Sequence, residues 1–213
     1  MTRYVLPCLC LAALLASVGA SADSGADLVA SVQKHWAEAN YASKGKAREQ
    51  AFESLTAEAD SLVRAEPKRA EAHIWAGIVY STYAGEVSIF SAGKQVKRAR
   101  SELEQALAID PDAMNGSAYT SLGALLYQIP GVMGGDDDKA EQLLRKGVEL
   151  NRDGIDSNYF YATFLIDQKR YDEALDYLQK AAAAPDRPSR PLADRGRRAE
   201  IAAALEDLRK RTS

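Results

Sequence analysis

Cysteine is nearly absent from this 213-residue sequence, and both copies, Cys8 and Cys10, lie within its first 22 residues. That segment has the features of a Sec-type signal peptide, because Arg3 precedes an apolar run from Val5 to Val18 and a small-x-small motif ends at Ala22. The run is shorter than the roughly 20 residues that cross a bilayer as a helix. Cleavage after Ala22 leaves a chain without a thiol, and we expect that chain to be periplasmic or secreted.

The sequence also has no excess of basic residues, few histidines and none of the common catalytic motifs. Its formal net charge of −3 becomes −4 without Arg3, which argues against nucleic acid as a partner. No later apolar run is long enough to span a bilayer. The two histidines, His35 and His73, belong to no H-E-x-x-H motif, and no G-x-S-x-G motif is present. We therefore expect no enzymatic activity, no metal and no cofactor.

A repeat of small and large apolar residues is present instead. Four segments carry a small or apolar residue at a first position and again four and seven positions later. Their members are Leu55, Ala59 and Leu62; Ala99, Leu103 and Ala106; Ala140, Leu144 and Gly147; and Ala174, Leu178 and Ala181. Prolines follow two of the segments, at Pro67 and Pro111. This pattern is typical of the second helix of a tetratricopeptide repeat, where small residues let two helices approach closely.

The matching first helices carry a small residue at Gly77, Gly123 and Ala162. Their spacings to the alanines of the second helices are 22, 17 and 12 residues, and the last is the standard tetratricopeptide spacing. The extra residues fall in two turns, GEVSIFSAGK at 85–94 and IPGVMGGDDD at 129–138. The sequence therefore predicts an all-α, tetratricopeptide-like α-solenoid of about four helix pairs.

The expected helices divide the chain into three parts: a signal peptide at 1–22, a repeat domain at 23–184, and a proline-rich linker with a C-terminal capping helix at 185–213. The predicted pairs are 27–40 with 46–65, 70–84 with 93–109, 116–129 with 138–150, and 155–168 with 171–184. A capping helix gives the end of a solenoid a polar outer face. We interpret its basic residues, which include Arg195, Arg197 and Arg198, as a solvated face.

The acidic turn at 129–138 invites a comparison with ion sites. A calcium loop needs alternating acidic residues and a later glutamate, and a phosphate loop needs a glycine five residues before Gly-Lys and then Ser or Thr. Neither pattern is met by this turn or by the Gly93-Lys94 segment. We expect Asp136, Asp137 and Asp138 to cap the following helix, where negative charge favours the free N–H groups.

The concave face of the solenoid is the expected binding groove. Repeat register places a mixture of polar, apolar and aromatic residues there, with Tyr127 and Tyr159 as anchors. The groove residues are Glu71, Ile74, Ile78, Tyr127, Gln128, Asp156, Tyr159, Thr163 and Asp167. The absence of a Lys, Arg and Asn set argues against a peptide C-terminus as the ligand. A partly apolar protein segment or a small amphipathic molecule fits better.

The two long turns lie at the same edge of neighbouring repeats, so stacking should bring them together. Their apolar residues are Ile89, Phe90, Val132 and Met133. Exposed, these four would form a patch facing a partner. Folded back, they would form a satellite core, and both alternatives stay open at this point.

Beyond the repeats, several features together resemble the T-component of TRAP transporters. These are the signal peptide, the irregular repeat array and the two turns, including Gly134-Gly135 before Lys139-Ala140. The similarity is clearest over residues 70–184. It implies a protein partner, a periplasmic solute-binding protein, and leaves a homo-oligomer open. The alternative function is a general adaptor for protein–protein contacts in the envelope.

Overall fold

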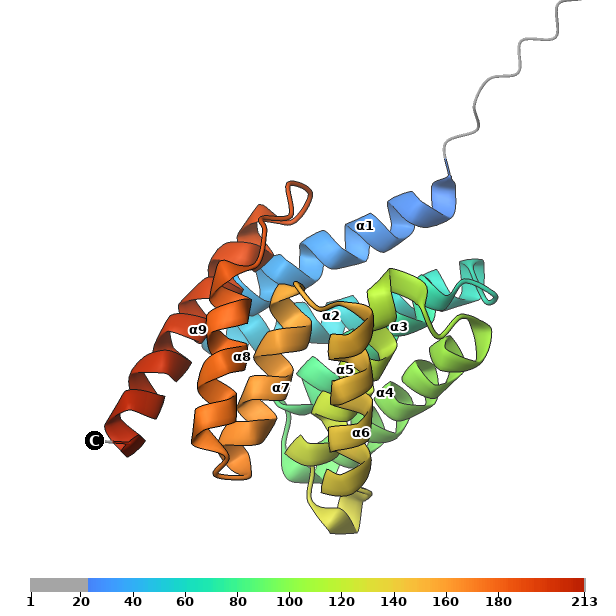
Figure 1. Ribbon diagram of the computed structural model, residues 1–213. Coiled ribbons are helices and arrows are strands. Elements are labelled where there is room, and N and C mark those ends of the chain that lie inside the picture. The colour runs from blue at the N-terminus through green and yellow to red at the C-terminus, as the bar shows by residue number, and fades with distance from the viewer. Residues whose placement is uncertain (1–22, 213) are drawn as a thin grey trace, which may run out of the picture.

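The computed structural model describes residues 23–212, and every regular element within that range is helical (Figure 1). The expected signal peptide lies outside the described residues. The elements are α1 (Ser24–Ala37), the π-helix η1 (Glu38–Ala42), α2 (Gly45–Ala65), α3 (Ala70–Ala84), α4 (Ile89–Ile109), α5 (Ala113–Gln128), the 3₁₀ turn η2 (Gly131–Met133), α6 (Asp137–Leu150), α7 (Ile155–Asp167), α8 (Tyr171–Ala183) and α9 (Pro191–Thr212). The all-α prediction is confirmed.

The helices form four antiparallel pairs, α1 with α2, α3 with α4, α5 with α6 and α7 with α8. Figure 1 shows α5 to α8 standing side by side, with α1, α2 and α3 crossing behind them. Contacts between α3 and α5 and between α5 and α7 join the first helices of successive pairs into one layer. This is the stacked arrangement of a tetratricopeptide-like solenoid, as the spacing predicts.

Close approach within the pairs explains the repeat pattern. A Cβ on Gly77 would lie 2.5 Å from Leu103 Cγ, and one on Gly123 would lie 3.0 Å from the carbonyl oxygen of Ala140. Leu103 and Ala140 are themselves fully buried. The remaining repeat residues of the second helices are buried as well, which confirms the helical register.

Among the predicted helix starts, that of α4 differs most from the structure. Helix α4 begins at Ile89 rather than at Gly93, because Ser91 and Ala92 already donate helical hydrogen bonds to the carbonyl of Ser88. A glycine inside a helix costs only about 1 kcal/mol, so Gly93 does not stop it. The long turn before α4 is therefore shorter than predicted, and the extra residues lengthen the helix.

The chain is irregular before the regular part of α5, where Met114, Asn115 and Gly116 all have positive φ angles of 50°, 54° and 74°. The regular part of α5 follows Gly116, in agreement with the predicted start of that helix. Leu150 packs so closely there that a Cβ on Gly116 would lie 2.6 Å from its Cδ1.

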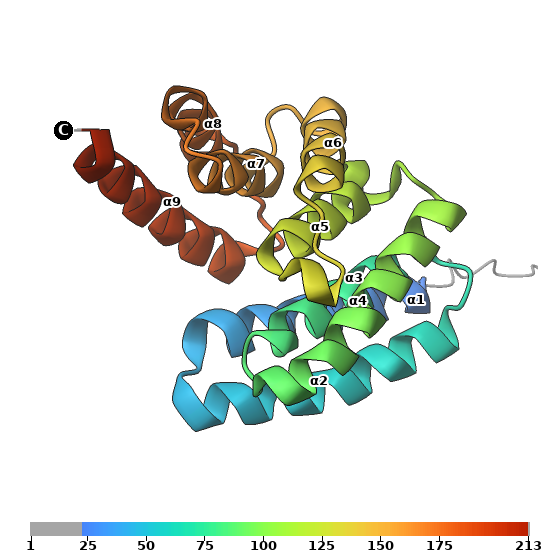
Figure 2. The same ribbon diagram turned by 90° about the horizontal axis from the view of Figure 1, so that it is seen from below.

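The C-terminal helix does more than cover the last pair. Helix α9 contacts α7 and α8, and it also contacts η1 of the first pair (Figure 2). At that contact, a Cβ on Gly196 would lie 2.3 Å from the ring of Tyr41. The end of the solenoid thus meets its beginning, and the concave face is closed on this side.

The interpretation of the basic residues of α9 as a solvated face is wrong for Arg197. This residue is only 7% exposed, because α9 turns it inward between α7 and η1. Its guanidinium stacks on Tyr159 and Phe160, 4.4 Å and 4.6 Å from the two ring centroids.

Candidate functional site: a central cavity with a charged wall

A cavity of about 960 Å³ occupies the concave side of the helix stack. Residues of α1, α3, α5 and α7, the first helices of the four pairs, line it, together with the start of α4, the segment before α9 and α9 itself. Its size lies near the upper end of ordinary small-molecule sites. Of the nine groove residues, Ile78, Gln128 and Asp156 line this cavity.

The other groove residues lie elsewhere. Ile74 is fully buried in a small cluster with Ala70, Ala106, Ala113 and Ala118. Glu71 borders a second depression of about 460 Å³ beside Lys68 and Arg69. Asp167 is exposed at the end of α7.

The three remaining groove residues form packing contacts beside the cavity. Tyr127 and Thr163 share a hydrogen bond between their hydroxyl groups at 2.9 Å, and the ring of Tyr127 packs edge-on against Phe164. Tyr159 packs against Phe160 and under Arg197. Burial raises the pKa of both tyrosines above its ordinary value. Both side chains therefore pack on the core beside the cavity rather than line it.

The four residues of the long turns differ in exposure. Phe90 and Val132 are each 96% exposed and Ile89 is 68% exposed, whereas Met133 is partly buried against the core. A Cβ on Gly93 would lie 3.9 Å from Met133 Cε, so α4 and η2 are neighbours. Ile89 and Met133 also line the cavity. We call Ile89, Phe90 and Val132 the apolar rim.

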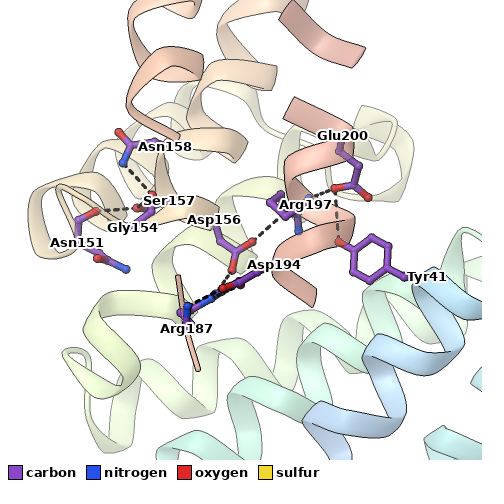
Figure 3. A network of polar contacts seen from close by, with 10 residues as sticks. All are labelled: Tyr41, Asn151, Gly154, Asp156, Ser157, Asn158, Arg187, Asp194, Arg197 and Glu200. Carbon is purple, nitrogen blue, oxygen red and sulfur yellow. Dashed lines mark hydrogen bonds and ion pairs between the residues drawn. The ribbon is translucent and has the colours of Figure 1, made fainter. Parts of the chain in front are cut away.

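The part of the cavity wall formed by α7, the segment before α9 and α9 carries a network of ion pairs (Figure 3). Asp156, in the first turn of α7, accepts from Arg187 Nη1 at 2.6 Å and from Arg197 Nε at 2.8 Å. Asp194 accepts from the backbone N–H and Nε of Arg187, and Glu200 pairs with Arg197 and accepts a 3.5 Å hydrogen bond from Tyr41. The network therefore ties α7, the segment before α9, α9 and η1 together.

Local turns fix the position of Asp156. Ser157 donates to the carbonyl of Asn151 at 2.7 Å, and Asn158 donates to the carbonyl of Arg152 at 2.8 Å. These bonds hold the turn between α6 and α7 beside Asp156 (Figure 3), which lines the cavity at the start of α7.

Charge sets the protonation state of this cluster. Burial alone would raise the pKa of Asp156, but the charges of Arg197, Arg187 and Arg190 hold it well below its ordinary value. Burial likewise opposes the charge on Arg197, but Asp156 and the other acidic neighbours, Tyr41, Glu200 and Tyr159, together outweigh it, so the pKa of Arg197 is raised. The Tyr41 hydroxyl, mainly through burial, has its pKa raised to about 12. The carboxylate and the guanidinium groups are therefore all charged near neutral pH.

A family model described as TRAP transporter T-component matches residues 42–201, which run from α2 into the first half of α9 and include Asp156, Arg187 and Arg197 of the charged wall. The chain belongs to the TRAP transporter T-component family. The resemblance drawn from the sequence is thereby confirmed. No curated protein sequence matches this chain.

A solved structure supports the fold of this T-component family member. A thermophilic tetratricopeptide protein of Thermus thermophilus, TTC0263, is similar with a TM-score of 0.55 and 18% identity, over 85% of this chain and 99% of that chain. A crystal structure of MamA is similar with a TM-score of 0.45 and 18% identity, over 76% of this chain and 88% of that one. At such low identity the likeness concerns the fold alone.

Sequence reasoning missed the arginines of the cavity wall. Arg187 and Arg190 belong to the segment APDRPSRP, whose three prolines indicate a linker, and Arg197 lies in a mixed-charge helix. The available signal was the number of arginines in so short a segment of an acidic chain.

Asp136, the first aspartate of the acidic turn, caps α6 as predicted. Asp136 Oδ1 accepts the backbone N–H of Lys139 at 2.9 Å and so caps α6, while Asp137 and Asp138 lie in its first turn. Between residues 23 and 212 there is no cluster of three or more potential metal-binding side chains of the His, Cys, Asp or Glu type. In the same range, no helix has the length and apolar character needed to cross a bilayer.

Proposed function

We propose that this protein is a non-enzymatic periplasmic binding and scaffold protein that assists TRAP-type solute uptake by docking a periplasmic solute-binding protein. Membership of the T-component family supports the association with TRAP transport. The signal-peptide features of the first 22 residues support the location.

The apolar rim is the observation that carries the docking part of the proposal. Phe90, in the first turn of α4, and Val132, in η2, are almost fully exposed, and these two elements are neighbours beside the cavity-lining residues Ile89 and Met133. Large side chains left this exposed contribute little to the fold, and adjacent ones on a monomer commonly mark a contact surface. A partner bound here would cover the mouth of the cavity beside Ile89 and Met133.

The test measures binding of the purified protein to the solute-binding protein encoded beside its transporter, by surface plasmon resonance. Phe90→Asp with Val132→Asp should weaken binding by more than tenfold, because a charge placed in an apolar contact must be desolvated. Leu175→Asp, at a 38% exposed leucine on α8, is the matched control and should bind as the unaltered protein does.

Thermal melts accompany these measurements, and the rim variant should melt within a few degrees of the unaltered protein. If the rim variant binds the solute-binding protein normally, the docking surface is elsewhere. If the unaltered protein ignores that partner and instead retains an envelope assembly, the adaptor function replaces the proposal.

A further inference from the structure

Two buried hydrogen-bond donors in the cavity wall have no acceptor. Trp75 is 1% exposed, and its Nε1–H has no partner among the described residues; the same holds for Nε of Arg190. The neighbouring Trp36 shows the contrast, since its Nε1–H donates to Thr82 Oγ1 at 3.1 Å. Buried donors without a partner are uncommon and costly, so this pair requires an explanation.

The two donors lie together. The Arg190 guanidinium stacks over the Trp75 ring, with its carbon 4.9 Å from the ring centroid, and both residues line the central cavity. The backbone around Arg190 is fixed, because its N–H donates to the carbonyl of Arg187 and its carbonyl accepts from Asp194. The donors therefore have a defined place at the start of α9.

Arg190 is also the cavity arginine without a counterion. Within residues 23–212, Asp156, Asp194 and Glu200 form ion pairs with Arg187 and Arg197, and none of these pairs includes Arg190. Burial, followed by the positive charge of Arg187, lowers the pKa of Arg190. The stacked indole offsets part of this cost through a cation–π contact. An anion at this position would offset much more of it.

Apolar side chains of α3, of α5 and of the segment after α5 also line the cavity. Ile78, Leu125, Ile129 and Met133 line the cavity toward the apolar rim. The regular part of α5, 12 residues from Ser117 to Gln128, is roughly 18 Å long. A small acid would occupy a minor part of this space, whereas an elongated molecule would fill it.

We propose that the central cavity binds an elongated amphipathic anion, whose carboxylate or phosphate head accepts hydrogen bonds from Arg190 and Trp75 and whose apolar chain extends toward Met133. Two oxygens of one head group can serve two donors this close together. The proposal rests on the binding role proposed above and adds the chemical class of the ligand.

Isothermal titration calorimetry with simple probes tests it. Decanoate and decyl phosphate should bind the purified protein, decanol at least tenfold more weakly, and acetate without detectable heat. The relative affinities of decanoate and decyl phosphate then distinguish a fatty acid from a phosphate ester as the better head group. Equal binding of decanol and both anions would overturn the proposal.

Variants locate the head group. Arg190→Met keeps most of the side-chain stem and should weaken decanoate binding about 10- to 100-fold, the range for hydrogen bonds to a charged group. Trp75→Phe keeps an aromatic ring, removes the N–H and should weaken binding several-fold. Arg145→Met, whose side chain is 62% exposed on α6, is the matched control and should bind normally.

Thermal melts separate binding from a structural role. Without ligand, Arg190→Met should melt at the same or a higher temperature, because it removes a largely buried cation that forms no ion pair among the described residues; with decanoate, the rise in melting temperature should be lost. Unchanged decanoate affinity in Arg190→Met refutes the site. If that variant does not fold, unchanged affinity in Trp75→Phe refutes it equally.

No partner protein takes part in these titrations, so they are independent of the docking test. Anion binding without docking would contradict the proposed function alone. Docking without binding of decanoate or decyl phosphate would contradict the ligand class alone.

Discussion

Replacing Gly123 by alanine tests the physical reason for the repeat pattern. A Cβ at this position would lie 2.8 Å from Leu144 Cγ, 3.0 Å from the carbonyl oxygen of Ala140 and 3.1 Å from the backbone nitrogen of Leu144. Two of these three atoms belong to the backbone of α6. Rotation of one side chain therefore cannot relieve the contact, and α6 itself must move away from α5.

Two effects of opposite sign decide the outcome. Alanine is favoured over glycine inside a helix by about 1 kcal/mol. Overpacking of a close-packed interface costs about 1–3 kcal/mol, and the backbone contacts place Gly123→Ala toward the upper end. We expect a net loss of about 1–2 kcal/mol in the free energy of unfolding, or roughly 2–8 °C in melting temperature for a chain of this size.

Gly93→Ala is the matched control, because Gly93 also lies inside a helix but has open space around its Cβ position. The nearest atom, Met133 Cε, would be 3.9 Å away. Only the helix-propensity gain then applies, and the variant should be more stable by about 0.5–1 kcal/mol.

Urea titrations followed by far-UV circular dichroism measure both variants under the same conditions. The two changes should have opposite signs. If Gly123→Ala is stabilised as much as Gly93→Ala, close helix approach is not the reason for glycine at this repeat position.

Three further predictions concern Asp156, Phe90 and Asp136. Because the pKa of Asp156 is lowered, its ion pairs stabilise the fold above about pH 4, and this stabilisation is lost as the pH falls through the lowered pKa. Asp156→Asn, at a side chain that is 31% exposed, should therefore lower the free energy of unfolding by about 2–4 kcal/mol at pH 7. The loss should become smaller in acid, as urea titrations at several pH values would show. Phe90→Ala should change the free energy of unfolding by less than about 0.5 kcal/mol, whereas Phe52→Ala, in the core, should cost about 3–5 kcal/mol in the same assay. Asp136→Ala should lower the free energy of unfolding by about 1 kcal/mol through loss of the helix cap, and Asp136→Asn should lower it less, because Asn still caps. Calorimetry should detect no calcium binding to the unaltered protein or to either variant.

The sequence by itself determined the helices, their pairing and their packed faces. Residues such as Ala99, Leu103 and Gly123 recur at offsets that have a direct local meaning, because positions three or four apart share one face of a helix. Small residues at those offsets indicate close approach whatever the partner helix is. The cap at Asp136 follows from equally local chemistry, since its acceptor serves a donor three residues away.

The composition of the cavity was decided by the tertiary structure. Arg187 and Arg190 lie within a proline-rich segment and Arg197 lies in a mixed-charge helix, so nothing local predicts burial for them. Their place follows from the packing of α9 against both α7 and η1, which brings Arg197 and Tyr41 together across more than 150 residues of chain. Burial and charge pairing depend on which distant elements meet, because desolvation and Coulomb attraction act through space rather than along the sequence. For the same reason, only the folded chain stacks the Arg190 guanidinium on Trp75 in a cavity wall, where no ion pair among residues 23–212 includes it.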